Sequence, residues 1–407
     1  MVLEAPVETA TCADEFPSAA AAVAGGNNYH HPSTRATLGG FDPRAPLVQR
    51  PLPAKYWQLA DAELAERIAA ARTALGSRVV ILGHHYQRDE IVRFADFLGD
   101  SFKLSLQAAS RPDAQFIVFC GVHFMAESAD ILSGAEQRVI LPNLEAGCSM
   151  ADMADLDTVA ECWQSVEEEC GPGMLPITYI NSSADLKAFC GRHGGAVCTS
   201  SNAQAILRWA LDQSDRVLFF PDQHLGRNTA RELGIDPDRI VVWDPAEPLG
   251  GNDRAALRRA RLILWKGHCS VHMRFTTEQI AEARERYPGI RVIVHPECRS
   301  EVVRAADAVG STELIVKVIA ESPAGSQWAV GTEINLVSRI AKEYPDKLVF
   351  SLDPVVCPCA TMSRIHPAYL LWSLESLLTG EVVNQIVVAP EVARWARVAL
   401  TRMLEIA

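Results

Sequence analysis

The stretch RVVILGHHYQRDEIVRFADFLGDSFKLSLQAASRPDAQFIVFCG, residues 78–121, decides the fold class. It begins and ends with a continuous apolar run rich in β-branched residues, and a helix-length segment separates the two runs. Continuous apolar strands are typical of parallel sheets that helices cover on both faces, because such strands are buried on both sides. The stretch therefore predicts a strand–helix–strand unit of an α/β protein.

The same pattern recurs towards the end of the chain. Further apolar runs, each bounded by turn residues, are QRVILPN, LPITYIN, RVLFFPD, RIVVWD, RLILWKGHC, IRVIVHPE, ELIVKVI and KLVFSLDP. Their spacing predicts three α/β units. Each unit is expected to have three layers, with a parallel sheet between two layers of helices. We place these units at residues 55–170, 171–275 and 276–407, the last with the C-terminal helices. Residues 1–54 are rich in Ala, Gly, Pro, Asn and Ser and are expected to form a flexible extension.

Composition excludes several classes of protein. The 407 residues carry 38 Lys+Arg against 50 Asp+Glu, a net charge of -12, and no basic stripe is present, so we expect no nucleic-acid partner. An apolar run long enough to cross a membrane is absent, and the first residues carry acids where a secretory signal would carry bases. We therefore expect a cytoplasmic protein without a membrane partner. Its 11 cysteines, an odd number, are then thiols or ligands rather than a disulfide framework.

Polar side chains follow several of the predicted strands. His84 and Tyr86 end the first run, Tyr179 ends LPITYIN together with Asn181, and His295 is one of the residues that end IRVIVHPE. The carboxyl ends of strands in open α/β sheets are where ligands bind, because loops and helix N-termini converge there. The sequence therefore predicts a site at these ends.

Three cysteines also lie at or just after strand ends. They are Cys120 in QFIVFC, Cys269 in WKGHCSVH and Cys359 in PVVCPCATM. Their wide separation along the chain excludes a zinc knuckle, whose ligands come in close pairs. It leaves open that the three cysteines are buried core residues without a chemical function. If they act together, the fold must bring them together.

The motifs resemble those of the quinolinate synthase family from about residue 78 to residue 380. The motifs are GHHYQRDEIVRFADFLGDS, CGVHFMAESADIL, LPNLEAGCSMADM, TYINSSADLKA, CTSSNA, FPDQHLGRN, WKGHCSVH, VHPE, VGST and CATM. This resemblance implies three similar α/β domains around a pseudo-threefold axis, with the active site at the centre. It also implies one 4Fe-4S cluster held by three cysteines, one from each domain. The implied reaction condenses iminoaspartate with dihydroxyacetone phosphate to quinolinate, a step of de novo NAD biosynthesis.

Carried onto this chain, the resemblance puts the cluster on Cys120, Cys269 and Cys359. Cys357 is the alternative third ligand; Cys359 is preferred because it keeps a three-residue distance to Met362. Three thiolates leave one iron of the cluster open, and such an iron can act as a Lewis acid.

The resemblance also assigns the remaining site residues. Proton transfer falls to His84, Tyr86, His295 and Glu297, since imidazole and carboxylate groups exchange protons near neutral pH. The residues expected to bind substrate are His84, Ser101, Tyr179, Asn181, Ser200, His272, His295, Glu297, Ser311 and Thr312. The sequence GST at 310–312 is a turn that can hold phosphate. Lys266 or Arg227 could supply a cation nearby.

Two other classes of protein compete with this interpretation. An iron–sulfur sensor that has lost catalysis would lack the proton-transfer residues or carry a partner-binding appendage, and a zinc hydrolase would need close ligand pairs. An L-aspartate oxidase that supplies iminoaspartate is a candidate partner.

Overall fold

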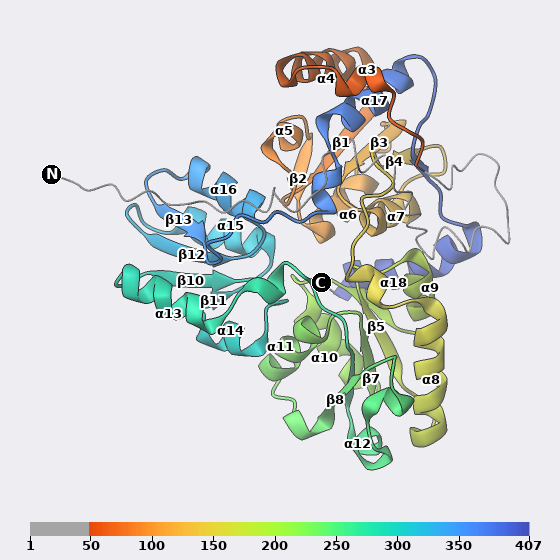
Figure 1. The fold of residues 1–407 in the computed structure, drawn as a ribbon. Coiled ribbons are helices and arrows are strands. Elements are labelled where there is room, and N and C mark those ends of the chain that lie inside the picture. The colour runs from red at the N-terminus through yellow and green to blue at the C-terminus, as the bar shows by residue number, and fades with distance from the viewer. Residues whose placement is uncertain (1–48, 407) are drawn as a thin grey trace.

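The computed structural model describes residues 49–406, so nearly all of the expected extension at 1–54 lies outside the described residues. The described chain forms three sheets with helices packed around each one, and Figure 1 shows three lobes that correspond to these sheets. Strands β1, β3, β7 and β9 are buried at every position. Burial on both faces explains the continuous apolar runs and confirms the α/β class with parallel sheets.

The first sheet has the strand order β14-β4-β3-β1-β2. Its strands are β1 (Val79–His84), β2 (Phe97–Gly99), β3 (Phe116–Cys120), β4 (Arg138–Ile140) and β14 (Gln385–Ile386). The helices that accompany it are α3 (Ala54–Trp57), α4 (Asp61–Leu75), α5 (Asp89–Val92), α6 (Ser101–Ala109) and α7 (His123–Leu132). All pairings in this sheet are parallel except the one between β14 and β4.

The second sheet is parallel throughout, in the order β6-β5-β7-β9-β8. Its strands are β5 (Leu175–Tyr179), β6 (Ala196–Cys198), β7 (Val217–Phe220), β8 (Ile240–Trp243) and β9 (Leu262–Trp265). Its helices are α8 (Leu156–Cys170), α9 (Ala184–Arg192), α10 (Ala203–Gln213), α11 (Gln223–Glu232) and α12 (Arg254–Arg259). Helix α8 packs against α9 and α12, so it lies with the second sheet.

The third sheet is also parallel, in the order β11-β10-β12-β13. Its strands are β10 (Arg291–Val294), β11 (Ala308–Val309), β12 (Gln327–Gly331) and β13 (Leu348–Ser351). Its helices are α13 (Thr277–Arg286), α14 (Ser300–Ala305), α15 (Thr312–Glu321) and α16 (Ile334–Glu343).

One predicted strand is wrong. The run ELIVKVI, residues 313–319, lies in helix α15, and the strand of this region is β12. Ile315 and Ile319 are buried four residues apart while Leu314 is 42% exposed, which is the pattern of a helix face. The Ser311 side chain caps the helix by accepting from the backbone N–H of Leu314 at 3.4 Å. An N-cap and a helical burial period outweigh the β-branched composition.

The C-terminal segment runs back over the other two units. Helix α17 (Pro367–Leu378) packs against α4, β14 adds an antiparallel edge to the first sheet, and α18 (Pro390–Ile406) packs against α9. The segment that we expect in the third unit thus connects all three units. Within residues 49–406, no helix is both long enough and apolar enough to span a membrane.

Candidate active site

Strand ends from all three sheets meet at one cavity, which most of the expected site residues line. Those residues are His84, Tyr86, Ser101, Tyr179, Asn181, Ser200, Cys269, His295, Glu297, Thr312 and Cys359. Cys120, His272 and Ser311 are absent from its lining. His272 lies directly behind the lining against Glu297, and Ser311 lines a neighbouring groove.

The third thiol of the cavity is Cys148, which the sequence analysis gave no role. Cys148 follows β4 in the loop LPNLEAGCSMADM and lines the cavity together with Cys269 and Cys359. Burial raises the pKa of Cys148 to about 12, and the nearby Cys359 contributes to the same shift. Each of the three cysteines follows a strand of a different sheet.

Cys120, which we expect beside Cys269 and Cys359, does not line this cavity. Cys120 is the fully buried last residue of β3, and burial alone raises its pKa to about 12. Cys120 is paired in register with Gly83, one position before His84, so its side chain leaves the sheet on the opposite face from that of His84. The signal that could have found Cys148 is its place in a Gly-Cys-Ser turn after the apolar run RVIL.

The loop of Cys148 is fastened to the segments that carry the other two thiols. The Asn143 side chain accepts from the N–H of Glu145 at 2.9 Å and donates to the carbonyl oxygen of Arg364 at 3.1 Å. On the other side, Trp265 Nε1 donates to the carbonyl oxygen of Met153 at 2.7 Å. The loop is thus tied to the turn after Cys359 and to the strand before Cys269.

A glycine allows the chain to reach Cys269. A Cβ atom on Gly267 would lie 2.2 Å from the carbonyl oxygen of Pro221. Any larger residue would push the segment between β9 and Cys269 away from the end of β7.

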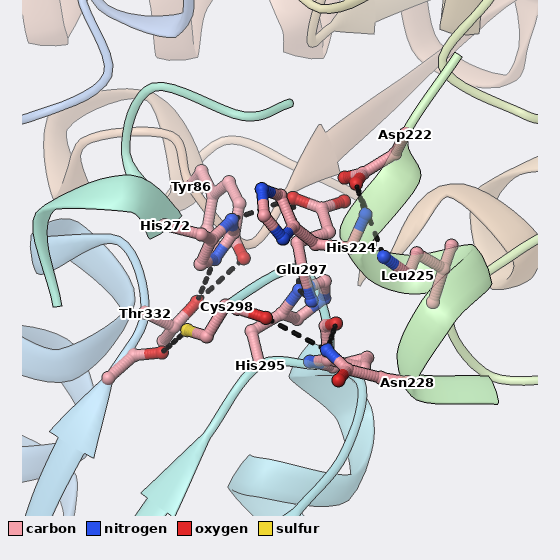
Figure 2. Close-up of polar contacts among 12 residues, drawn as sticks. Tyr86, Asp222, His224, Leu225, Asn228, His272, His295, Glu297, Cys298 and Thr332 are labelled. Carbon is pink, nitrogen blue, oxygen red and sulfur yellow. Dashed lines mark hydrogen bonds and ion pairs between the residues drawn. The ribbon is translucent and has the colours of Figure 1, made fainter. Parts of the chain in front are cut away.

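Glu297 is the centre of a buried polar cluster. Its Oε2 lies 2.6 Å from Nδ1 of His272 and 3.8 Å from Nδ1 of His295 (Figure 2). The two imidazoles stack with centroids 4.4 Å apart and an interplanar angle of 17°. Tyr179 also hydrogen-bonds to Glu297. The cluster holds one carboxylate in a fixed orientation.

This carboxylate is ionised. Burial by itself raises the pKa of Glu297, but the nearby His295 and His272 and the hydrogen bonds from His272 and Tyr179 outweigh burial and hold it at about 2. Burial lowers the pKa of His295 to about 3, so its imidazole is neutral at neutral pH. Glu297 therefore presents a negative charge to the cavity.

Asp222 is a second buried carboxyl group near Glu297, and its pKa is shifted in the opposite direction. It follows β7, and its Oδ1 accepts from the N–H groups of His224 and Leu225 at 2.7 and 3.2 Å (Figure 2). Its Oδ2 is buried and has no hydrogen-bond partner among residues 49–406. Burial first, and then the charge of Glu297, raise the pKa of Asp222 well above its ordinary value. Two carboxyl groups with opposite shifts are typical of acid–base sites.

His84 presents a defined tautomer. The backbone N–H of Tyr86 donates to Nδ1 of His84 at 3.1 Å, and burial lowers the pKa of this imidazole well below its ordinary value. The neutral ring therefore carries its proton on Nε2. The Tyr86 ring packs edge-on against His84 at 4.8 Å, and its hydroxyl contacts Thr332 Oγ1 at 2.7 Å. Both side chains line the cavity, and each carries a group that can donate a hydrogen bond.

Anions can be held by helix N-termini. Helices α6, α10 and α15 each begin close to the cavity, because Ser101, Ser200 and Thr312 line it. Thr312 Oγ1 is buried and makes no hydrogen bond within the described chain, so it is available to form a hydrogen bond with a ligand. Free N–H groups and partial positive charge at these ends suit phosphate and carboxylate.

Cations do not line the cavity. Among residues 49–406, no lysine or arginine lines the cavity, and Arg227 is therefore outside the lining. Lys266 is exposed and pairs with Asp244 at 2.5 Å. Neither Lys266 nor Arg227, from which we expect a cation, belongs to the lining of the cavity in the described part of the chain.

The donor set suits a metal group. The cavity is lined by three partly buried thiols, which are soft ligands of the kind that iron–sulfur clusters require. One ligand atom each from Cys269, His272 and Glu297 lies within 4.8 Å of the other two. The residues present thus fit a thiolate-bound metal centre beside an ionised carboxylate.

The fold and this cavity are those of an α/β enzyme with a buried site. The family model described as Quinolinate synthetase A protein matches residues 66–405. The quinolinate synthase of Corynebacterium glutamicum is 59% identical over 359 residues, covering 88% of this chain and 91% of the relative. The enzymes of that name from Nocardioides sp. and Anoxybacillus flavithermus are 56% and 52% identical, covering 84% and 87% of this chain and 89% and 96% of theirs. The chain belongs to the quinolinate synthase family.

Proposed function

We propose that this enzyme condenses iminoaspartate with dihydroxyacetone phosphate to quinolinate, with loss of phosphate and water, in de novo NAD biosynthesis. The observation that carries the proposal is the meeting of three thiols, an ionised carboxylate and three helix N-termini in one cavity. The names of the relatives support the same reaction.

The cofactor in this proposal is one 4Fe-4S cluster on Cys148, Cys269 and Cys359. Cys359 is preferred to Cys357 because only Cys359 lines the cavity. When bound, a cluster with three thiolate ligands supplies an open iron that acts as a Lewis acid on a substrate oxygen or nitrogen. Each of these cysteines follows a strand of a different sheet. A pseudo-threefold arrangement of the three units would give this distribution.

The protein's own residues move the protons. Glu297 accepts a proton at Oε2, while His272 and Tyr179 keep that carboxylate oriented. His84 donates from Nε2 to a substrate carboxylate or carbonyl, and Tyr86 donates from its hydroxyl once it leaves Thr332. The formation of an aromatic ring from an imine and a triose needs such donors and acceptors, because hydroxyl groups must leave as water.

The helix N-termini hold the anionic groups. Thr312, Ser101 and Ser200 bind the phosphate and carboxylate groups through hydroxyl and backbone N–H donors. These donors carry no full charge and so bind phosphate less tightly than a lysine or arginine would. Phosphate can therefore leave once its bond to the triose is broken. An L-aspartate oxidase is the proposed source of iminoaspartate, which is unstable in water.

The test is anaerobic purification with iron and sulfide quantitation, followed by an assay for quinolinate from dihydroxyacetone phosphate and enzymatically generated iminoaspartate. About four irons per chain with product would support both cofactor and reaction. A cluster without product would favour the sensor, and no cluster would refute the cysteine assignment.

A further inference from the structure

A contact outside the cavity joins the first and third units. Nε2 of His85 lies 2.8 Å from Oε1 of Glu313, and Lys103 Nζ donates to the same oxygen at 3.3 Å. His85 follows β1, Lys103 belongs to α6, and Glu313 lies in the first turn of α15. Two units of the chain therefore share one carboxylate.

The position of this contact relates it to the site. His85 directly follows His84, and Glu313 directly follows Thr312; both of these neighbours line the cavity. The contact thus connects the backbone that carries a proton donor to the helix N-terminus that presents an unpartnered hydroxyl.

The His85 end of the contact is shielded from water. Its side chain is 7% exposed, and Arg339 Nη1 donates to the carbonyl oxygen of Gln87 at 3.2 Å, which fixes the loop after β1. The hydrogen bond from His85 is the main cause that holds the pKa of Glu313 at about 2. A shielded hydrogen bond to a charged group is stronger than an exposed ion pair.

The charges also favour an anionic ligand. An unpaired carboxylate one residue after Thr312 would repel phosphate at the N-terminus of α15. His85 and Lys103 bind that carboxylate from the side of the first unit and so reduce its repulsion.

We propose that His85 and Glu313 are positioning residues, which hold the first turn of α15 and its Thr312 in place relative to His84. The identity of the anion rests on the proposed function, whereas the positioning role does not.

Hydrogen exchange of the metal-free full chain tests the positioning role directly. In Glu313→Ala, amides of the peptide covering residues 311–319 should exchange about fivefold faster than in the wild type. Glu313→Gln keeps an acceptor for His85 and should restore most of the protection. The matched control is Lys342→Ala, which removes the exposed Lys342–Asp89 pair at 2.6 Å between the same two units and should leave this peptide unchanged.

Kinetics of the cluster-loaded enzyme test the effect on substrate. Glu313→Ala should raise the KM for dihydroxyacetone phosphate about fivefold and change kcat by less than about twofold. Unchanged exchange in Glu313→Ala, or an equal change in Lys342→Ala, would overturn the positioning role. Faster exchange with an unchanged KM would overturn its link to substrate. A wild-type enzyme without product would refute the proposed function, while the exchange experiment would still decide the positioning role.

Discussion

Nδ1 of His272 lies 2.6 Å from Oε2 of Glu297, although His272 follows the second sheet and Glu297 follows the third. Both side chains are almost fully buried, at 1% and 4% exposed. A buried carboxylate needs such a partner, because an unpaired charge away from water is costly. The contact between these two units is thus part of the site itself.

Replacing Cys148 by Ser should remove the cluster, because the cavity loses one of its three thiols. Iron content after anaerobic purification should fall from about four per chain to near zero, and the visible absorption should disappear. Cys120→Ser is the matched control, since Cys120 is buried away from the cavity, and it should retain its iron. The reverse result would restore the ligand set expected from the sequence.

Replacing Glu297 by Gln should slow turnover about 10²- to 10⁴-fold and leave the iron content unchanged, because an amide cannot accept the proton. The measurement is kcat of the loaded variant at neutral pH beside its iron content. Glu282→Gln, on the exposed face of α13, should behave like the wild type. A Glu297→Gln enzyme with a wild-type rate would show that Glu297 does not take part.

Replacing Thr312 by Val should separate stability from binding. The Thr312 hydroxyl is buried and makes no hydrogen bond within the described chain, so its loss should leave the free energy of unfolding unchanged or raise it by about 1 kcal/mol. The KM for dihydroxyacetone phosphate should rise about tenfold. Chemical denaturation and steady-state kinetics measure the two effects. Lower stability with an unchanged KM would assign the hydroxyl a structural role.

Asp185 should make stability depend on pH. Burial first, and then the charge of Glu127, raise the pKa of Asp185 to about 7 from an ordinary value of 3.8. A raised carboxyl pKa means that the folded chain binds a proton that the unfolded chain releases. The stability from this group is therefore full below about pH 4 and is lost as the pH rises towards 7.

The test compares Asp185→Asn with the wild type by urea denaturation between pH 4 and pH 8. The stability of the variant relative to the wild type should rise across this range by a few kcal/mol. Asp157→Asn, on an exposed part of α8, should show no such trend. Parallel profiles for wild type and Asp185→Asn would refute the assignment.

Local pattern was enough to predict the fold class and much of the cavity. Apolar runs identify strands buried on both faces, and polar residues at or just after the strand ends, such as His84, Tyr179 and His295, lie at the carboxyl edge of a sheet. These inferences need only the alternation of strands and helices, which short-range sequence controls.

The local sequence pattern gave a wrong prediction where the same composition suits both a strand and a helix. The β-branched run at 313–319 suits a strand or a helix, and the buried positions Ile315 and Ile319 became a helix face only because the third sheet covers that side. Likewise, nothing in the sequence of the first unit alone excludes Cys120.

The sequence by itself determined that this chain forms α/β units with a polar site at the strand ends. Only the tertiary structure decided that Cys148 joins Cys269 and Cys359, that His272 meets Glu297, and that His85 meets Glu313. The physical reason is that the partners in these contacts are brought together by the packing of separate sheets. Spacing along the chain carries no information about that packing.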